Sequence, residues 1–146
     1  MHVLVTTDGT QQSLKATRFL GNLVNPATVA KITVLAVIRP LAAVPFANEF
    51  EEGEAKGDGS FTISFRREAQ AAVERVAAEM KGLAPVVETT VRAGSPADEI
   101  IRVASEIDAD LIVVGGRGKS VVGAILIGSV AYRVLHHAPC PVLVTR

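Results

Sequence analysis

Short runs of aliphatic residues alternate with longer amphipathic stretches along this chain. Four runs consist mostly of β-branched and aliphatic residues, and a fifth run is weaker because polar residues interrupt it. The strong runs cover residues 2–6, 32–38, 110–114 and 141–145, and the weak run covers residues 86–92. Three of the strong runs are almost continuously apolar, as strands covered on both faces require. The pattern therefore predicts an α/β protein with a parallel sheet.

The stretches between these runs have the periodicity of helices. Apolar residues return every three or four positions over residues 11–24, 61–82, 96–107 and 129–137. In the second of these helices one apolar stripe contains Ala69, Val73, Val76 and Met80, which we interpret as core. Strands that alternate with helices imply right-handed crossovers, with helices on both faces of the sheet.

The length and the charge of the chain limit its partners. With 146 residues we expect one domain over residues 1–146, in which residues 39–60 form a long surface loop, acidic in its second half. Fifteen basic residues balance fifteen acidic ones, so the positive charge of a non-specific nucleic-acid binder or a polybasic membrane protein is absent. The most apolar long stretch, residues 121–131, is too short to span a membrane. We therefore expect neither nucleic acid nor a membrane as a partner.

The cysteine and histidine residues argue against a disulfide or a resident metal site. The single cysteine, Cys140, excludes an intrachain disulfide and a cysteine-rich zinc site, and we interpret it as a small buried residue. His136 and His137 are neighbours on a predicted helix and point about 100° apart, so they cannot both bind one metal from one face. The chain opens on a strand-like run rather than an export signal, so we expect a cytoplasmic protein.

Glycines that follow two predicted strands mark the candidate chemistry. After the first strand the single Gly9 cannot supply the three-glycine fingerprint of a dinucleotide site. Residues 118–120 resemble the end of a Walker A loop, but the first glycine of that motif would fall on Val113, inside a strand. What remains is the pattern Gly115-x2-Gly118-x9-Gly128-Ser129.

This glycine pattern has two interpretations. Glycines let the backbone approach an anion, and Gly128, Ser129 and Val130 would offer the free amides of a helix start to phosphate oxygens. Alternatively, the glycines serve only tight turns and the start of a helix. Asp8 also has two interpretations, because it could bind a ligand or cap the first helix with Thr10.

Motifs spread over the whole chain match one known pattern. They lie at residues 5–10, 35–37, 110–115, 117–118, 127–130 and 137–144. In these motifs the chain resembles the universal stress protein family, and the glycine pattern resembles that of its UspA-like, nucleotide-binding branch. The resemblance implies a Rossmann-like fold with one open five-stranded parallel sheet in the order 3-2-1-4-5. It also implies an ATP site at the carboxyl ends of strands one and four.

The resemblance assigns roles to single residues. Thr6 would lie beside adenine, the Val37 backbone would read adenine, and Asp8 would face the ribose or a phosphate-bound Mg²⁺. Val114 and Gly115 would flank the ribose and the first phosphate. The rest of the phosphate chain would be held by Gly118, Gly128, Ser129 and the Val130 N–H. The charge of Arg117, apart from the resemblance, could complement phosphate or be a solvated loop charge. Gly116 departs from the family, in which many members carry serine or threonine there.

We therefore expect an ATP-binding regulatory protein of the stress response, with a protein partner of unknown identity. The resemblance implies that the edge strand at residues 141–145 pairs with its copy in a homodimer. No residue is placed by the sequence to activate water, so fast ATP hydrolysis is not expected. Two alternatives remain: a dimeric interaction module without a working nucleotide site, and a slow ATPase or phosphoryl or adenylyl transferase in which Asp8 holds Mg²⁺.

Overall fold

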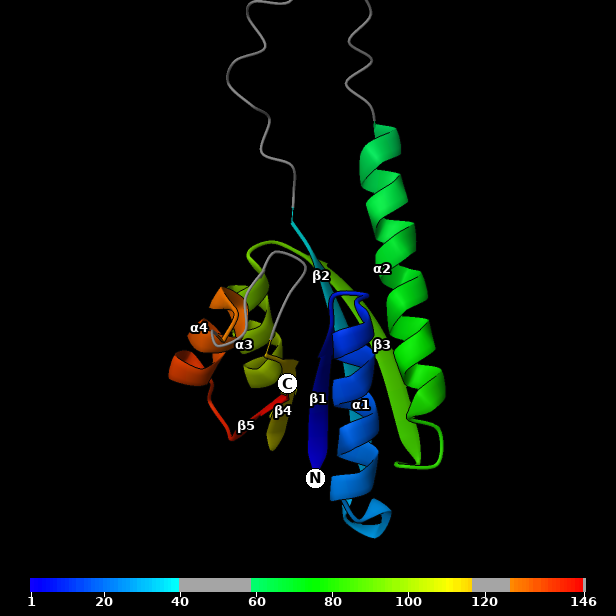
Figure 1. The fold of residues 1–146 in the computed structure, drawn as a ribbon, viewed down its shortest axis with the longest axis vertical. Helices are drawn as coiled ribbons and strands as arrows, with labels where there is room; N and C mark the ends of the chain where they lie inside the picture. Colours follow the sequence, from blue (N-terminus) through cyan, green and yellow to red (C-terminus); the bar gives the residue numbers. More distant parts are fainter. Residues whose placement is uncertain (40–58, 117–126, 146) are drawn as a thin grey trace, which may run out of the picture.

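The structure of the chain, a computed structural model, describes residues 1–39, 59–116 and 127–145, with side chains from residue 65 onward in the second range. Five parallel strands form one sheet in the order β3-β2-β1-β4-β5 (Figure 1). They are β1 (His2–Thr7), β2 (Lys31–Ile38), β3 (Val86–Ala93), β4 (Leu111–Gly115) and β5 (Val142–Thr145). The predicted sheet and its strand order are confirmed. The expected loop over residues 39–60 lies largely outside the described residues.

Two helices cover each face of the sheet (Figure 1). α1 (Gln11–Leu23) and α2 (Gly59–Glu79) pack on one face, and α3 (Pro96–Glu106) and α4 (Ser129–His137) pack on the other. A short 3-10 helix (Pro26–Thr28), which the periodicity does not predict, lies between α1 and β2. None of the described helices is apolar over a stretch long enough to cross a membrane.

Successive strand residues supply two separate cores. In β1, Val3 and Val5 face α1 and α2, whereas Leu4 faces α3 and α4, and all three are fully buried. The apolar stripe of α2 is core as predicted, since Val73 and Val76 are fully buried against the sheet. Burial on both faces makes the central strands a firm support for the residues at their ends.

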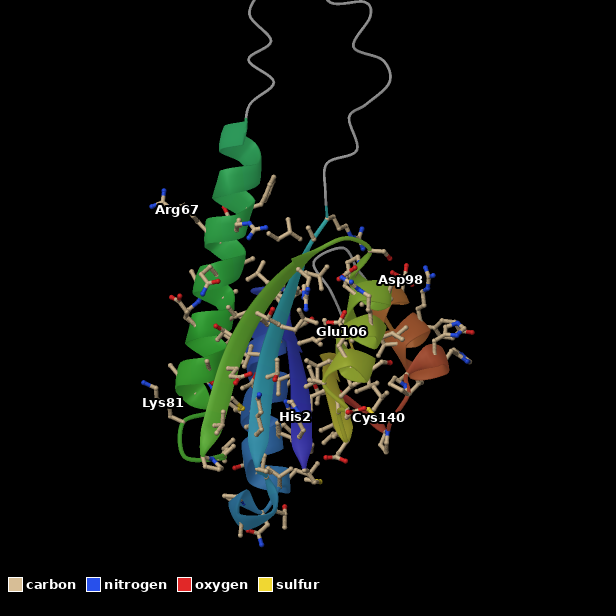
Figure 2. All side chains as sticks on the ribbon, turned by 180° about the vertical axis from the view of Figure 1, so that it is seen from behind. His2, Arg67, Lys81, Asp98, Glu106 and Cys140 are labelled. Atoms are coloured by element: carbon tan, nitrogen blue, oxygen red, sulfur yellow. The ribbon has the colours of Figure 1, made fainter. Side chains whose placement is uncertain are left out.

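Polar contacts close the amino ends of the strands. The ring of His2 (Figure 2) lies between Thr33 Oγ1, at 2.8 Å from Nε2, and the carbonyl oxygen of Ile107, at 3.1 Å from Nδ1. The backbone N–H of His2 donates to Asp110 Oδ2 at 2.7 Å. The opposite, carboxyl end of the sheet is the end that holds a cavity.

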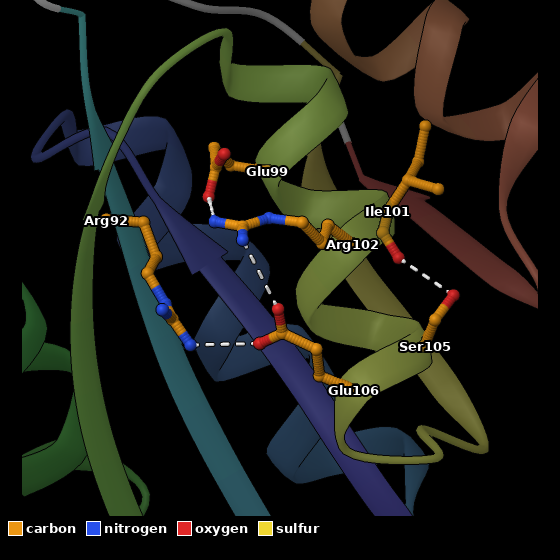
Figure 3. Close-up of polar contacts among 6 residues, drawn as sticks. All are labelled: Arg92, Glu99, Ile101, Arg102, Ser105 and Glu106. Carbon is orange, nitrogen blue, oxygen red and sulfur yellow. Dashed lines mark hydrogen bonds and ion pairs between the residues drawn. The ribbon is translucent and has the colours of Figure 1, made fainter.

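An ion-pair network links α3 to the outer strand β3 (Figure 3). Arg92 of β3 and Arg102 of α3 both pair with Glu106, and Arg102 also pairs with Glu99. Both arginines are at least 40% exposed, so solvent screens these pairs and each contributes little to stability. The network helps to orient α3, whose first turn reaches the carboxyl end of the sheet.

Candidate functional site

A cavity of about 730 Å³ lies at the carboxyl ends of β1, β2 and β4. At this point the crossover after β1 leaves on one face of the sheet, and α4, which follows β4, packs on the other face, so the two crossovers diverge. All the described residues that the sequence nominates for a nucleotide site line it: Thr6, Asp8, Val37, Val114, Gly115, Gly128, Ser129 and Val130. Arg117 and Gly118 lie outside the described residues. The structure therefore brings together the parts of the predicted site that it describes.

The turn after β1 holds Asp8 in place. Gly9 has φ of +78°, a conformation that suits glycine, and its N–H donates to Thr7 Oγ1 at 3.1 Å. Asp8 Oδ1 accepts two hydrogen bonds, from the N–H of Thr10 at 3.0 Å and from its hydroxyl at 2.6 Å. Thr10 in turn caps α1, where it accepts from the N–H of Ser13. Asp8 thus supports the helix start and also lines the cavity, so both interpretations of this residue apply to the geometry.

The hydroxyl groups of Thr6, Thr7 and Ser13, which line the cavity, form hydrogen bonds within the protein. The buried Thr6 hydroxyl donates to the carbonyl oxygen of Val113 at 3.1 Å. Thr7 Oγ1 and Ser13 Oγ lie 2.8 Å apart and share a hydrogen bond. Thr6 can therefore meet a ligand through its methyl group or its backbone, while its hydroxyl stays with β4.

The end of β2 presents a backbone acceptor. β2 runs two residues beyond its last pair with β1, which joins Thr7 to Ala36. The Ile38 carbonyl accepts from the N–H of Gly94 and so faces β3. Because alternate residues of a parallel strand face opposite neighbours, the carbonyl of Val37 points to the side of β1, past the end of that strand. This position suits an acceptor for the amino group of a base.

The start of α4 offers a set of backbone donors. The first helical bond runs from the N–H of Tyr132 to the Gly128 carbonyl at 2.9 Å. The amides of Ser129, Val130 and Ala131 precede that bond and have no acceptor within the helix. Together with the helix dipole they make the cavity wall suitable for an anion.

The expectation for Gly128 needs a correction. Its N–H donates to the carbonyl oxygen of Gly116 at 2.7 Å, so this amide holds the backbone together rather than facing a ligand. Gly116 itself donates to the carbonyl oxygen of Thr145 at 2.6 Å. A Cβ atom on Gly116 would lie 2.8 Å from that same oxygen, which explains why this position carries glycine here.

Sequence reasoning missed one wall of the cavity. Phe65, Glu68, Ala69 and Ala72 of α2 line it, at the spacing of one helix face, and Arg75 lies one turn further along. Periodicity assigns α2 to the core because its later half covers the sheet. The signal in the sequence is a second stripe of residues at helical spacing. It begins at Phe65 and is rotated about the helix axis relative to the core stripe.

Cys140 and His136 do not line the cavity. Burial raises the pKa of the Cys140 thiol, and the charge of Asp110 raises it further, so the thiol stays protonated at neutral pH. The rings of His136 and Tyr132 form a tilted contact, with centroids 4.5 Å apart and 58° between the ring planes, on the exposed side of α4. Across the described ranges, no three His, Cys, Asp or Glu residues gather closely enough to hold a metal.

Comparison with known proteins relates this geometry to a family. A sequence profile of the Universal stress protein family matches residues 1–146. The chain belongs to the universal stress protein family. One relative, "Universal stress protein MJ0531" of Methanocaldococcus jannaschii, is 30% identical over 145 residues, which are 99% of this chain and 81% of that protein. The resemblance inferred from the motifs is confirmed.

Solved structures of the universal stress protein family share the fold. UspA from Lactobacillus plantarum superposes with a TM-score of 0.77 at 24% identity and covers 100% of this chain and 97% of its own. A universal stress protein in complex with cAMP has a TM-score of 0.61 at 25% identity and covers 100% of this chain and 96% of its own. The Rossmann-like architecture of this universal stress protein is therefore that of the family.

Proposed function

We propose that this universal stress protein binds ATP with Mg²⁺ in the cavity and acts as a regulatory protein of the stress response. The observation that carries the proposal is the convergence of three polar groups on one cavity. They are the Val37 carbonyl, the Asp8 carboxylate and the amides that start α4. The relative solved with cAMP supports an adenine nucleotide as the ligand class. Nucleotide occupancy would shift the population of a state that a protein partner recognises.

Each part of ATP has a complementary group in this arrangement. The adenine amino group would donate to the Val37 carbonyl, and the phosphate chain would accept from the amides of Ser129 and Val130. Asp8 uses Oδ1 for the turn, which leaves Oδ2 for a ribose hydroxyl or for Mg²⁺. Arg117 and Gly118 would complete the phosphate loop, and Val114 and Gly115 would flank the ribose, as in the family pattern.

Slow hydrolysis or group transfer is a second candidate function. Its support is Glu68, a second carboxylate on the cavity wall besides Asp8. We favour binding because the chain has no complete Walker A motif and because one Asp8 oxygen is already committed. Single-turnover phosphate release separates the two candidates, since release at ordinary enzymatic rates, about 1 s⁻¹ or faster, would establish an enzyme.

We also propose that the protein is a homodimer paired through β5. This strand is one of the two edges of the sheet, and exposed apolar side chains flank it on both faces. On α1, Phe19 and Leu23 are 51% and 57% exposed, and they lie on the flank turned away from α2. On α4, Leu135 is 47% exposed and lies away from α3. A second copy across a two-fold axis would cover these side chains and pair the free edge.

A thermal-shift titration tests nucleotide binding. Mg-ATP, AMP and cAMP are compared with buffer, and a ligand at 100 times its dissociation constant should stabilise the protein by about 2.7 kcal/mol. For a chain of this length the unfolding midpoint should rise by roughly 10 °C. If no nucleotide moves the midpoint, the interaction module without a nucleotide site is the better account.

A further inference from the structure

One partly exposed aromatic side chain lies on the cavity wall. Phe65 is the only aromatic residue among the described residues that line the cavity, and it is 42% exposed. By contrast, Val73 and Val76 of α2 are buried against the sheet, as is Met80 just after the helix. An exposed apolar ring inside a cavity is typical of a ligand-binding surface.

The position of Phe65 follows from the direction of α2. This helix joins the parallel strands β2 and β3, so it runs antiparallel to both. Ala72 lies beside the turn after β1, since a Cβ atom on Gly9 would be 3.6 Å from its Cβ. From Ala72 back to Phe65 the helix rises about 10 Å. Phe65 therefore lies beyond the end of β1. The first turns of α2 extend past the sheet (Figure 1).

The other face of the cavity has a matching apolar wall. Pro96 and Ile100 of α3 line the cavity from the opposite side of the sheet, and Ile100 is buried. Val37 also lines the cavity, at the end of β2, and both α2 and α3 contact this strand. A flat ring whose amino group reaches the Val37 carbonyl would have one apolar wall on each of its faces.

We propose that Phe65 stacks on the nucleobase and makes the site selective for purine nucleotides. This inference rests on the proposed nucleotide site and adds a specificity residue from α2. Stacking on an aromatic ring strengthens with the size of the base, so a purine gains more than a pyrimidine. The phosphate contacts at α4 are the same for both kinds of nucleotide. The Val37 carbonyl responds to an amino group rather than to the size of the base, so the part of the preference that comes from stacking is assigned to the wall that contains Phe65.

Calorimetric titration of Phe65 variants with Mg-ATP and Mg-UTP tests the inference, because the two ligands share ribose and triphosphate. Phe65→Ala should weaken ATP binding roughly 5- to 100-fold. UTP binding should weaken less, so the preference for ATP over UTP falls. Phe65→Tyr should keep the preference, and Phe65→Leu, which is apolar without a ring, should lower it as Phe65→Ala does. Gln70→Ala is the matched control, because Gln70 is exposed on α2 and does not line the cavity.

The possible outcomes separate the role of Phe65 from the existence of the nucleotide site. If Phe65→Ala binds ATP as tightly as the natural protein, or weakens ATP and UTP by the same factor, Phe65 does not read the base, and the nucleotide site stands. If the natural protein binds neither nucleotide, both the site and this inference are overturned. A melting curve of each variant without ligand checks folding, and Phe65→Leu carries the test if Phe65→Ala does not fold.

Discussion

At the residue scale, the groups that face the cavity with hydrogen-bonding capacity are largely backbone groups. The carbonyl of Val37 and the amides of Ser129 and Val130 hold their positions because the strand and the helix behind them are packed. Asp8 is fixed by two hydrogen bonds from Thr10. Such groups lose little freedom when a ligand binds, which favours affinity.

Gly116 is the residue on which the geometry around β4 and β5 depends most directly. Gly116→Ala would place a Cβ atom 2.8 Å from the Thr145 carbonyl oxygen and 3.2 Å from a methyl group of Val144. We expect the free energy of unfolding to fall by about 1–3 kcal/mol, because backbone must move to relieve the overlap. Urea denaturation followed by circular dichroism measures the change. Equal stability of the variant and the natural protein would show that this approach is looser than the structure indicates.

The sequence predicted which residues lie near the cavity when those residues belong to a motif. It did not predict which backbone groups are used in hydrogen bonds within the protein. Asp8, Val37 and Ser129 reach one cavity as their motifs predict. The amide of Gly128 does not face it, because its partner, Gly116, is set by the chain path after β4. A bond of this kind depends on distances that a sequence does not contain.

At the element scale, β5 is the strand through which we propose that two copies of the chain pair. The carbonyls of Pro141 and Thr145 accept from β4, so odd-numbered residues face the sheet and Val144 directs its N–H to the free edge. Proline is tolerated at an edge position whose N–H faces outward. Val144→Pro should therefore keep the fold and abolish pairing between copies, whereas Val144→Ile should keep both.

Analytical ultracentrifugation measures the effect of these two changes. We expect the natural protein and Val144→Ile to sediment as dimers and Val144→Pro as a monomer with a native circular dichroism spectrum. A Val144→Pro dimer of unchanged affinity would place the interface elsewhere, and a monomeric natural protein would remove the homodimer from the account.

The helices and strands themselves were largely predictable, because each has one dominant hydrophobic period. α4 covers the predicted residues 129–137, and β2 begins one residue earlier than expected. α2 shows the limit of this reasoning. Its core stripe was visible in the periodicity, but Phe65 and Glu68 gain their significance from a cavity that three-dimensional packing creates.

At the scale of the whole molecule, the strand order places the ends of β1, β2 and β4 around one hollow, and the two helical layers supply its walls. The alternating pattern predicts this architecture because parallel strands with helical crossovers pack in few ways. The central claim is that backbone amides at the start of α4 hold the phosphate chain of ATP in that hollow.

The most direct test of this claim is the affinity for Mg-ATP of two variants at one position. Ser129 is the first residue of α4, where proline fits the helix but removes the N–H. Ser129→Ala keeps the N–H and loses only the hydroxyl. We expect calorimetry to show that Ser129→Pro weakens ATP binding by about 1.5–3 kcal/mol, while Ser129→Ala stays closer to the natural protein. Unchanged affinity in Ser129→Pro, with its fold intact, would contradict the claim.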